Sequence, residues 1–141
     1  MASFTGNIGD NANHLGFKYS IEKIIKKKVL EWEKIEIRKH YQNYSEIDKI
    51  IFDDHFIDHI NSFDLFVIGG GNFFELWIEN SATGTTIDLT IESLNKIKIP
   101  IIFNALGVDG YKGYSNNTLE KFENFINSCY SKNNIFLSVR N

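Results

Sequence analysis

Three consecutive glycines, Gly69, Gly70 and Gly71, are the residues of this chain best suited to hold a small anion. Glycine permits positive φ angles and lets a ligand approach the bare main chain, so successive N–H groups can cradle phosphate or carboxylate oxygens. Asn72 follows directly and adds a side-chain amide. The sequence therefore predicts an anion site at 69–72, although a tight turn packed against a helix would show the same pattern.

Three other stretches carry groups that could join this site. Asn7, Gly9 and Asp10 precede or open a predicted helix, whose N-terminal N–H groups and positive dipole end favour an anion. Asp10 could equally be only the cap of that helix. Gly107 lies in a second glycine-rich turn, and Arg140 has a planar guanidinium suited to a carboxylate or phosphate, although an isolated arginine is often simply solvated.

The elements that would position these residues alternate between strand and helix. The run from Phe63 to Ile68 is apolar on both faces, which is typical of a central strand in a parallel sheet. We expect further strands at 1–5, in the second half of 29–38, at 101–103 and at 134–141. We expect helices at 10–28, at 45–61, from 83–86 onward and from Ser115 onward.

This order predicts a Rossmann-like, doubly wound parallel α/β sheet of about five strands, in a single domain over residues 1–141. Ligands of such sheets bind at the carboxyl ends of the strands. Right-handed crossovers would place all these ends along one edge, together with the glycine turns, Asp10 and Arg140.

Composition excludes several other classes. A net charge of −3 and a pI near 5.8 give no general attraction to nucleic acid. The single cysteine, Cys129, is expected to be a buried apolar residue, and the absence of a disulfide framework favours a reducing, cytoplasmic location. No apolar run reaches the roughly 18 residues needed to span a membrane.

Known cofactor motifs are also missing. The glycines of TGNIGDNANHLG do not have the G-x-G-x-x-G spacing of NAD or FAD sites, and GxxxxGK[ST] is absent. His55 and His59 have a spacing that can bind zinc, but no third ligand is evident. We therefore predict no metal and no cofactor. His14, near the expected binding edge, is a further functional candidate.

Four stretches together resemble the polysaccharide pyruvyl transferase family: TGNIGDNA at 5–12, FDLFVIGGGNFF at 63–74, IPIIFNALGVDG at 99–110 and LSVRN at 137–141. The resemblance implies an enzyme that moves a pyruvyl group from phosphoenolpyruvate, its donor substrate, to hydroxyls of a sugar acceptor. The reaction forms a ketal and releases phosphate. It implies a GT-B-like enzyme in which residues 7–10, 69–72 and Gly107 line a cleft and Arg140 contacts the donor. Asp10 is then a candidate general base.

Two departures accompany the resemblance. The family motif usually continues SVRD, whereas Asn141 follows Arg140 here, and the family's second domain, with its catalytic histidine and arginine, is not within these 141 residues. We therefore expect an N-terminal half that is inactive by itself. Two alternatives stay open: a non-catalytic binding module for a phosphorylated metabolite, and a half-domain of a sugar-nucleotide glycosyltransferase.

Overall fold

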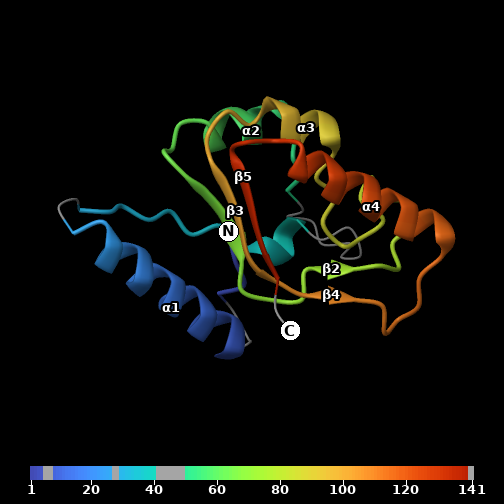
Figure 1. Ribbon diagram of the computed structural model, residues 1–141, viewed down its shortest axis with the longest axis horizontal. Helices are drawn as coiled ribbons and strands as arrows, with labels where there is room; N and C mark the ends of the chain where they lie inside the picture. Colours follow the sequence, from blue (N-terminus) through green and yellow to red (C-terminus); the bar gives the residue numbers. More distant parts are fainter. Residues whose placement is uncertain (5–7, 27–28, 41–49, 140–141) are drawn as a thin grey trace.

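The computed structural model describes residues 1–4, 8–26, 29–40 and 50–139, which form a mixed α/β fold. Its main sheet has three parallel strands in the order β1-β3-β5, namely β1 (Phe66–Gly69), β3 (Ile101–Leu106) and β5 (Ile135–Val139). Helices α1 (Ile8–Ile24) and α4 (Asn116–Tyr130) lie on opposite faces of this sheet (Figure 1). The sheet is therefore covered from both sides.

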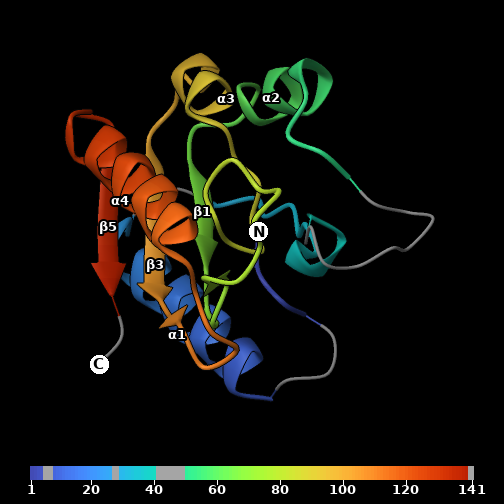
Figure 2. The ribbon, with the colours of Figure 1, turned by 90° about the vertical axis from the view of Figure 1, so that its right-hand side faces the viewer.

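The remaining elements lie at the two ends of the strands. Helices α2 (Asp54–Ile60) and α3 (Ile91–Lys96) lie side by side at the end where the strands of the main sheet begin (Figure 2). A second parallel sheet, of β2 (Phe74–Glu75) and β4 (Val108–Asp109), lies beyond the end of β1 and continues from β3. The sequence did not predict this small sheet, which holds the two glycine-rich turns against each other.

The expected five-stranded sheet is not shown. Among their described residues, the segments expected as strands at 1–5 and in the second half of 29–38 meet at an isolated parallel bridge between Ala2 and Glu36. The Ala2 N–H donates to the Ile35 carbonyl at 3.1 Å, and the Ile37 N–H donates to the Ala2 carbonyl at 3.0 Å. A 3₁₀ helix, η1 (Ile37–His40), begins directly after Glu36 and ends the extended segment.

Two helices begin later than predicted. The Asp53 side chain accepts the Phe56 N–H at 2.8 Å and caps α2, so this helix starts at Asp54; positions 45–49 of the predicted helix lie outside the described residues. Thr90 caps α3, and the predicted start at 83–86 is instead a turn whose buried threonines bond one another. The start of α4 was predicted correctly, because Ser115 caps it.

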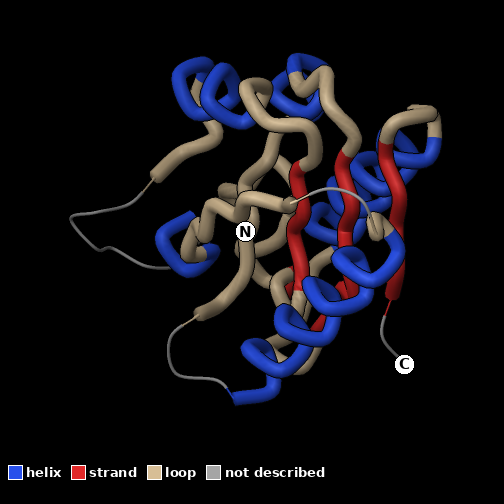
Figure 3. The backbone as a smooth tube through the Cα atoms, turned by 90° about the vertical axis from the view of Figure 1, so that its left-hand side faces the viewer, coloured by secondary structure: helices blue, strands red, loops and turns tan. Residues whose placement is uncertain are grey.

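Helix α1 differs most from the expected pattern. It begins at Ile8, two residues before the predicted start, and it ends at Ile24. Leu15 and Ile24, two of the regularly spaced apolar residues that indicated this helix, are 60% and 75% exposed. Figure 3 shows α1 crossing the face of the sheet opposite α4. The side chains of a helix project on all sides of its axis, so only those on one side of α1 can face the sheet.

The core lies mainly between the sheet and α4. The Phe74 ring lies 6.2 Å from Phe103, 5.5 Å from Phe122 and 6.0 Å from Phe125, between ring centroids. Cys129, fully buried in α4, belongs to the same core, as predicted. Since Phe74 belongs to β2, this aromatic cluster fixes the small sheet and its glycine turns to the main sheet.

Candidate functional site

The glycine turn after β1 packs directly against the first turn of α1. Gly70 has a φ of +98°, which glycine adopts without strain. A Cβ added at Gly70 would lie 3.2 Å from the Asp10 carbonyl oxygen, and one added at Gly71 would lie 2.9 Å from Asp10 Oδ1. The structure therefore brings Asp10, Gly70 and Gly71 together, and a side chain at Gly71 would crowd the Asp10 carboxylate.

Asp10 is buried, with 7% of its surface exposed. It is the third residue of α1 and not its cap, because the helix begins at Ile8. A carboxylate in the first turn of a helix is stabilised by the positive end of the helix dipole. Its position thus places a carboxyl group beside the glycine turn.

The two glycine-rich turns are joined by the small sheet. The Asn72 side-chain amide donates to Asp109 Oδ2 at 2.8 Å, and the Gly107 N–H donates to the Gly71 carbonyl at 3.1 Å. A Cβ added at Gly107 would collide with Asn72 Oδ1 and lie 2.9 Å from Asn72 Cα. Glycine at position 107 therefore allows Asn72 to take its place beside Asp109.

The predicted cradle of N–H groups is partly occupied by the protein itself. The Gly69 N–H donates to the Met1 carbonyl at 3.2 Å, and the Gly70 N–H donates to the Asn104 carbonyl at 3.2 Å. Among the described residues, no hydrogen bond from the Gly71 or Asn72 N–H group is found; Gly71 is buried and Asn72 is half-buried. These two adjacent donors are the part of the turn that could bind an anionic oxygen.

Sequence reasoning missed Asn104 and Ala105, which end β3 at this edge. Ala105 has a φ of 51°, uncommon for a residue with a side chain, and the β3–β5 register shifts between Phe103 and Leu106. Asn104 Nδ2 lies 3.5 Å from Asn13 Oδ1 of α1. The signal was a polar residue, Asn104, directly after the apolar run predicted as a strand at 101–103.

The structure describes only one of the three remaining predicted site residues. Gly9 is exposed in the first turn of α1. Asn7 and Arg140 lie outside the described residues. Val139, which precedes Arg140, pairs with Leu106 at the end of β3, next to Gly107. The last described residue of β5 thus lies at the same edge as the glycine turns.

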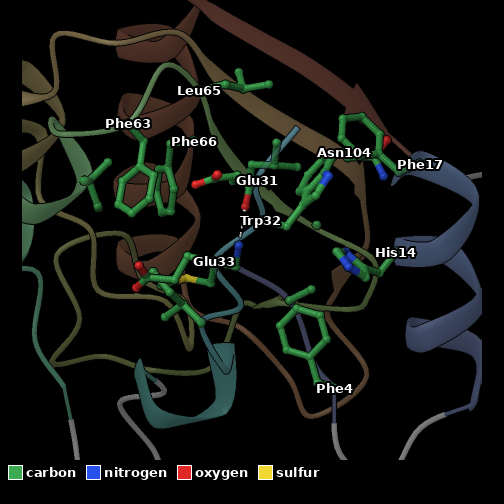
Figure 4. Close-up of a pocket in the computed structure, with 16 residues that line it drawn as sticks. Phe4, His14, Phe17, Glu31, Trp32, Glu33, Phe63, Leu65, Phe66 and Asn104 are labelled. Carbon is green, nitrogen blue, oxygen red and sulfur yellow. Dashed lines mark hydrogen bonds between the residues drawn. The ribbon is translucent and has the colours of Figure 1, made fainter. Parts of the chain in front are cut away.

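A pocket of about 80 Å³ opens beside this edge, on the α1 face of β1 (Figure 4). Aromatic side chains dominate its lining, and Gly69 and Asn104 connect it to the edge described above. The aromatic rings come from Phe4, Phe17, Trp32, Phe63 and Phe66.

His14 is the titratable ring of this pocket. Its Nε2 is buried without a hydrogen-bond partner, and its ring meets Phe4 edge to face with centroids 4.8 Å apart. Desolvation lowers the pKa of His14, and the positive charges of the N-terminus, Lys34 and Lys18 lower it further. His14 is therefore biased toward its neutral form.

The described residues contain no group of three or more side chains with metal-ligating chemistry. His59 Nε2 instead lies 2.8 Å from Glu33 Oε1, so this member of the His55–His59 pair is engaged by a carboxylate. No helix in the described part of the chain has the length and apolar character needed to cross a membrane.

Comparison with known proteins adds no relative: no protein-family model, no curated protein and no solved structure matches this chain.

Proposed function

We propose that this chain is a Rossmann-like domain of a polysaccharide pyruvyl transferase, one half of a GT-B-like enzyme that transfers a pyruvyl group from phosphoenolpyruvate to sugar hydroxyls. One observation carries the proposal. Asp10, the Gly70–Asn72 turn and Gly107 come from three distant parts of the chain and lie in contact at the carboxyl edge of the sheet. Ligands of parallel α/β sheets bind at that edge.

The hydrogen bonds of the N-terminal residues support the doubly wound sheet. The Met1 amine donates to the Val67 carbonyl at 2.6 Å, while the Gly69 N–H donates to the Met1 carbonyl. Residues 1–2 thus lie between β1 and the 35–37 segment. If these two segments are counted with the three strands of the main sheet, the order would be 35–37, 1–2, β1, β3 and β5, which supports a doubly wound domain with a switch point beside β1.

In this proposal, the Gly71 and Asn72 N–H groups hold oxygens of the donor, and Arg140 contacts its carboxylate or phosphate. An acid on the second domain protonates the methylene carbon of the enol, and a first sugar hydroxyl attacks the neighbouring cationic carbon. Phosphate then leaves that carbon, and a second hydroxyl of the same sugar attacks it and closes the ketal. Asp10 accepts the hydroxyl proton.

Calorimetric titration with phosphoenolpyruvate tests donor binding. Gly107→Ala should displace Asn72 and weaken binding at least about tenfold, because the added Cβ occupies the position of the Asn72 amide. Gly16→Ala is the matched control: Gly16 lies in α1 with nothing within 4 Å of an added Cβ, so affinity should not change. Equal affinity of the two variants for phosphoenolpyruvate would show that the glycine turns are not part of the donor site.

The role of Asp10 requires the complete two-domain enzyme. Asp10→Asn keeps the shape of the side chain and removes the basic oxygen, so turnover should fall at least about tenfold with little change in donor affinity. Turnover within a factor of about two of the wild type would exclude Asp10 as the base. Binding of a UDP-sugar without any response to phosphoenolpyruvate would favour a glycosyltransferase instead.

A further inference from the structure

Helix α1 carries an apolar stripe on the side that faces away from the sheet. Ile8 is 86% exposed, Leu15 is 60% exposed and Tyr19 is 67% exposed. Ala12, between the first two, is exposed as well. Their spacing of four, three and four residues places all of them on one side of the helix. In the described part of the chain, no other element lies on that side (Figure 1 and Figure 3).

The opposite side of α1, which faces the sheet, is the more polar of the two. Asp10 is buried there, and the residues that follow it on this side are half-buried: Asn13, His14, Phe17 and Ile21. A surface helix usually turns its apolar residues toward the core and its polar residues toward water. Because the outer side of α1 reverses this arrangement over three turns, it indicates a surface that binds a partner.

Lysines border the stripe on both sides. Each residue of a helix is rotated by about 100° from the one before, so Lys18 lies on one flank of the stripe and Lys23 on the other. Lys26 follows just after the end of the helix and is exposed. Lys18 Nζ lies 3.7 Å from Glu22 Oε1, but both side chains are well exposed, and such a pair contributes little.

This positive charge is local. Residues 18–28 hold five lysines and one glutamate, a net charge of +4, in a chain whose net charge is −3, so the other residues together carry −7. Two of these lysines, Lys27 and Lys28, lie outside the described residues. Lysines clustered along an amphipathic helix are typical of segments that bind anionic lipids. The helix can therefore be attracted to an anionic surface although the chain as a whole is acidic.

A lipid surface matches this arrangement better than a second copy of the chain does. The apolar side chains would enter the boundary between headgroups and acyl chains, while the lysines beside them reach the lipid phosphates. A second copy of α1 would bring the same lysines and only Glu22 as a counter-charge, because Asp10 faces the sheet. We propose that the outer side of α1 binds the surface of a membrane that contains anionic lipids.

The helix would lie on the membrane and not cross it. It has 17 residues, and its other side is engaged with the sheet, so only one side is free to meet lipid. The contact uses neither Asp10 nor the glycine turns. It therefore does not depend on the proposed function, and the two can fail separately.

Flotation of the full chain with lipid vesicles tests the proposal. The chain should bind vesicles of phosphatidylcholine with about 30% phosphatidylglycerol at least about tenfold more tightly than vesicles of pure phosphatidylcholine. Added salt should weaken binding to the anionic vesicles, because salt screens the attraction between lysines and headgroups.

Two apolar substitutions assign the stripe. Leu15→Ser and Tyr19→Ser should each weaken binding to the anionic vesicles at least about fivefold, because each removes an apolar side chain from the lipid. Tyr130→Ser is the matched control: Tyr130 is 73% exposed at the end of α4, and its loss should leave binding unchanged.

A charge reversal assigns the lysines. Lys23→Glu should weaken binding to the anionic vesicles at least about fivefold. Lys98→Glu makes the same change of net charge at an exposed position after α3 and should have an effect of less than about twofold. Since all of the substituted side chains are exposed, the variants should fold, and unchanged circular dichroism spectra would confirm it.

Three results would overturn the proposal: no binding to the anionic vesicles, equal binding to both kinds of vesicle, or equal affinity of Tyr19→Ser and Tyr130→Ser for the anionic vesicles. Sedimentation equilibrium without lipid identifies the alternative partner. Self-association that Leu15→Ser abolishes, without binding to vesicles, would assign the stripe to a contact between two copies of the chain and reject the membrane.

Discussion

Replacing His40 with leucine should stabilise the protein and reduce its sensitivity to acid. His40 is 1% exposed, and neither ring nitrogen has a hydrogen-bond partner. Its ring lies between Phe52 and Phe56, with centroids 4.8 Å from each. An unpaired buried polar group costs about 1–3 kcal/mol, and leucine fills a similar volume without one. We therefore expect His40→Leu to raise the free energy of unfolding by about 1 kcal/mol near neutral pH.

The pH dependence follows from the same burial. Desolvation, and then the charge of the N-terminus, lower the pKa of His40 from 6.5 to about 4. The unfolded chain therefore binds a proton more readily than the folded one, so stability is complete above pH 6.5 and falls as the pH drops toward 4. A pKa difference of about 2.5 corresponds to about 3 kcal/mol over the whole window, and to about 1 kcal/mol between pH 7 and pH 5.5.

Urea unfolding of the wild type and of His40→Leu at several pH values between 7 and 5 measures this contribution. The variant should lose less stability on acidification. Some dependence of the variant's stability on pH should persist, because burial also lowers the pKa of the Met1 amine to about 5 and lowers the pKa of His14. His55→Leu, at an exposed position of α2, is the control and should follow the wild type. Equal pH slopes for His40→Leu and the wild type would refute the reasoning.

Three further predictions concern the packing around α4. Gly84→Ala should destabilise the protein by at least about 2 kcal/mol, measured by urea unfolding. The reason is that Gly84 has a φ of +68° and that an added Cβ would lie 2.8 Å from Thr118 Cα. A loss of stability under about 0.5 kcal/mol would contradict this packing. Ser115→Ala should cost about 1 kcal/mol through loss of the α4 cap, measured in the same way, whereas an unchanged unfolding midpoint would show that the cap contributes nothing. Burial raises the pKa of Cys129 to about 12, so iodoacetamide should modify the native protein only as fast as it unfolds; rapid modification of the folded protein would disprove the burial.

The parts of the fold that the sequence predicted correctly depend on local signals. The apolar runs of β1 and β3 and the Ser115 cap of α4 are properties of a few adjacent residues, so their patterns were readable. The predicted helix start at position 45 lies outside the described residues, and the sequence analysis did not identify Asp53, whose side chain caps α2. A capping residue inside a predicted helix is recognised only once the structure shows its hydrogen bond.

The parts that were missed depend on contacts between distant residues. Strands β2 and β4 have two residues each, and they pair because Gly107 lets Asn72 approach Asp109. A two-residue strand has no periodicity to detect. Similarly, 83–86 looked like a helix start, but Thr83 bonds Thr85 instead of capping a helix. Asp109 became part of the candidate site only through this long-range pairing.

The edge at which the glycine turns meet was nevertheless predicted from strand order. Three parallel strands place Gly69, Leu106 and Val139 at the same edge, which follows from crossover geometry and requires no side-chain detail. The strand order did not predict which backbone N–H groups at this edge lack a partner. The Met1 and Asn104 carbonyls accept hydrogen bonds from two of the four N–H groups that were expected to bind a ligand.

An amide chemical-shift map of the chain titrated with phosphoenolpyruvate tests the anion site itself. Binding at the glycine turn should give the largest shifts at Gly71 and Asn72, whose N–H groups have no hydrogen-bond partner among the described residues, with smaller shifts at Gly107 and Asp10 across the turn. Shifts confined to the lysines at the end of α1, or no saturable shift at all, would contradict an anion site at the carboxyl edge of the sheet.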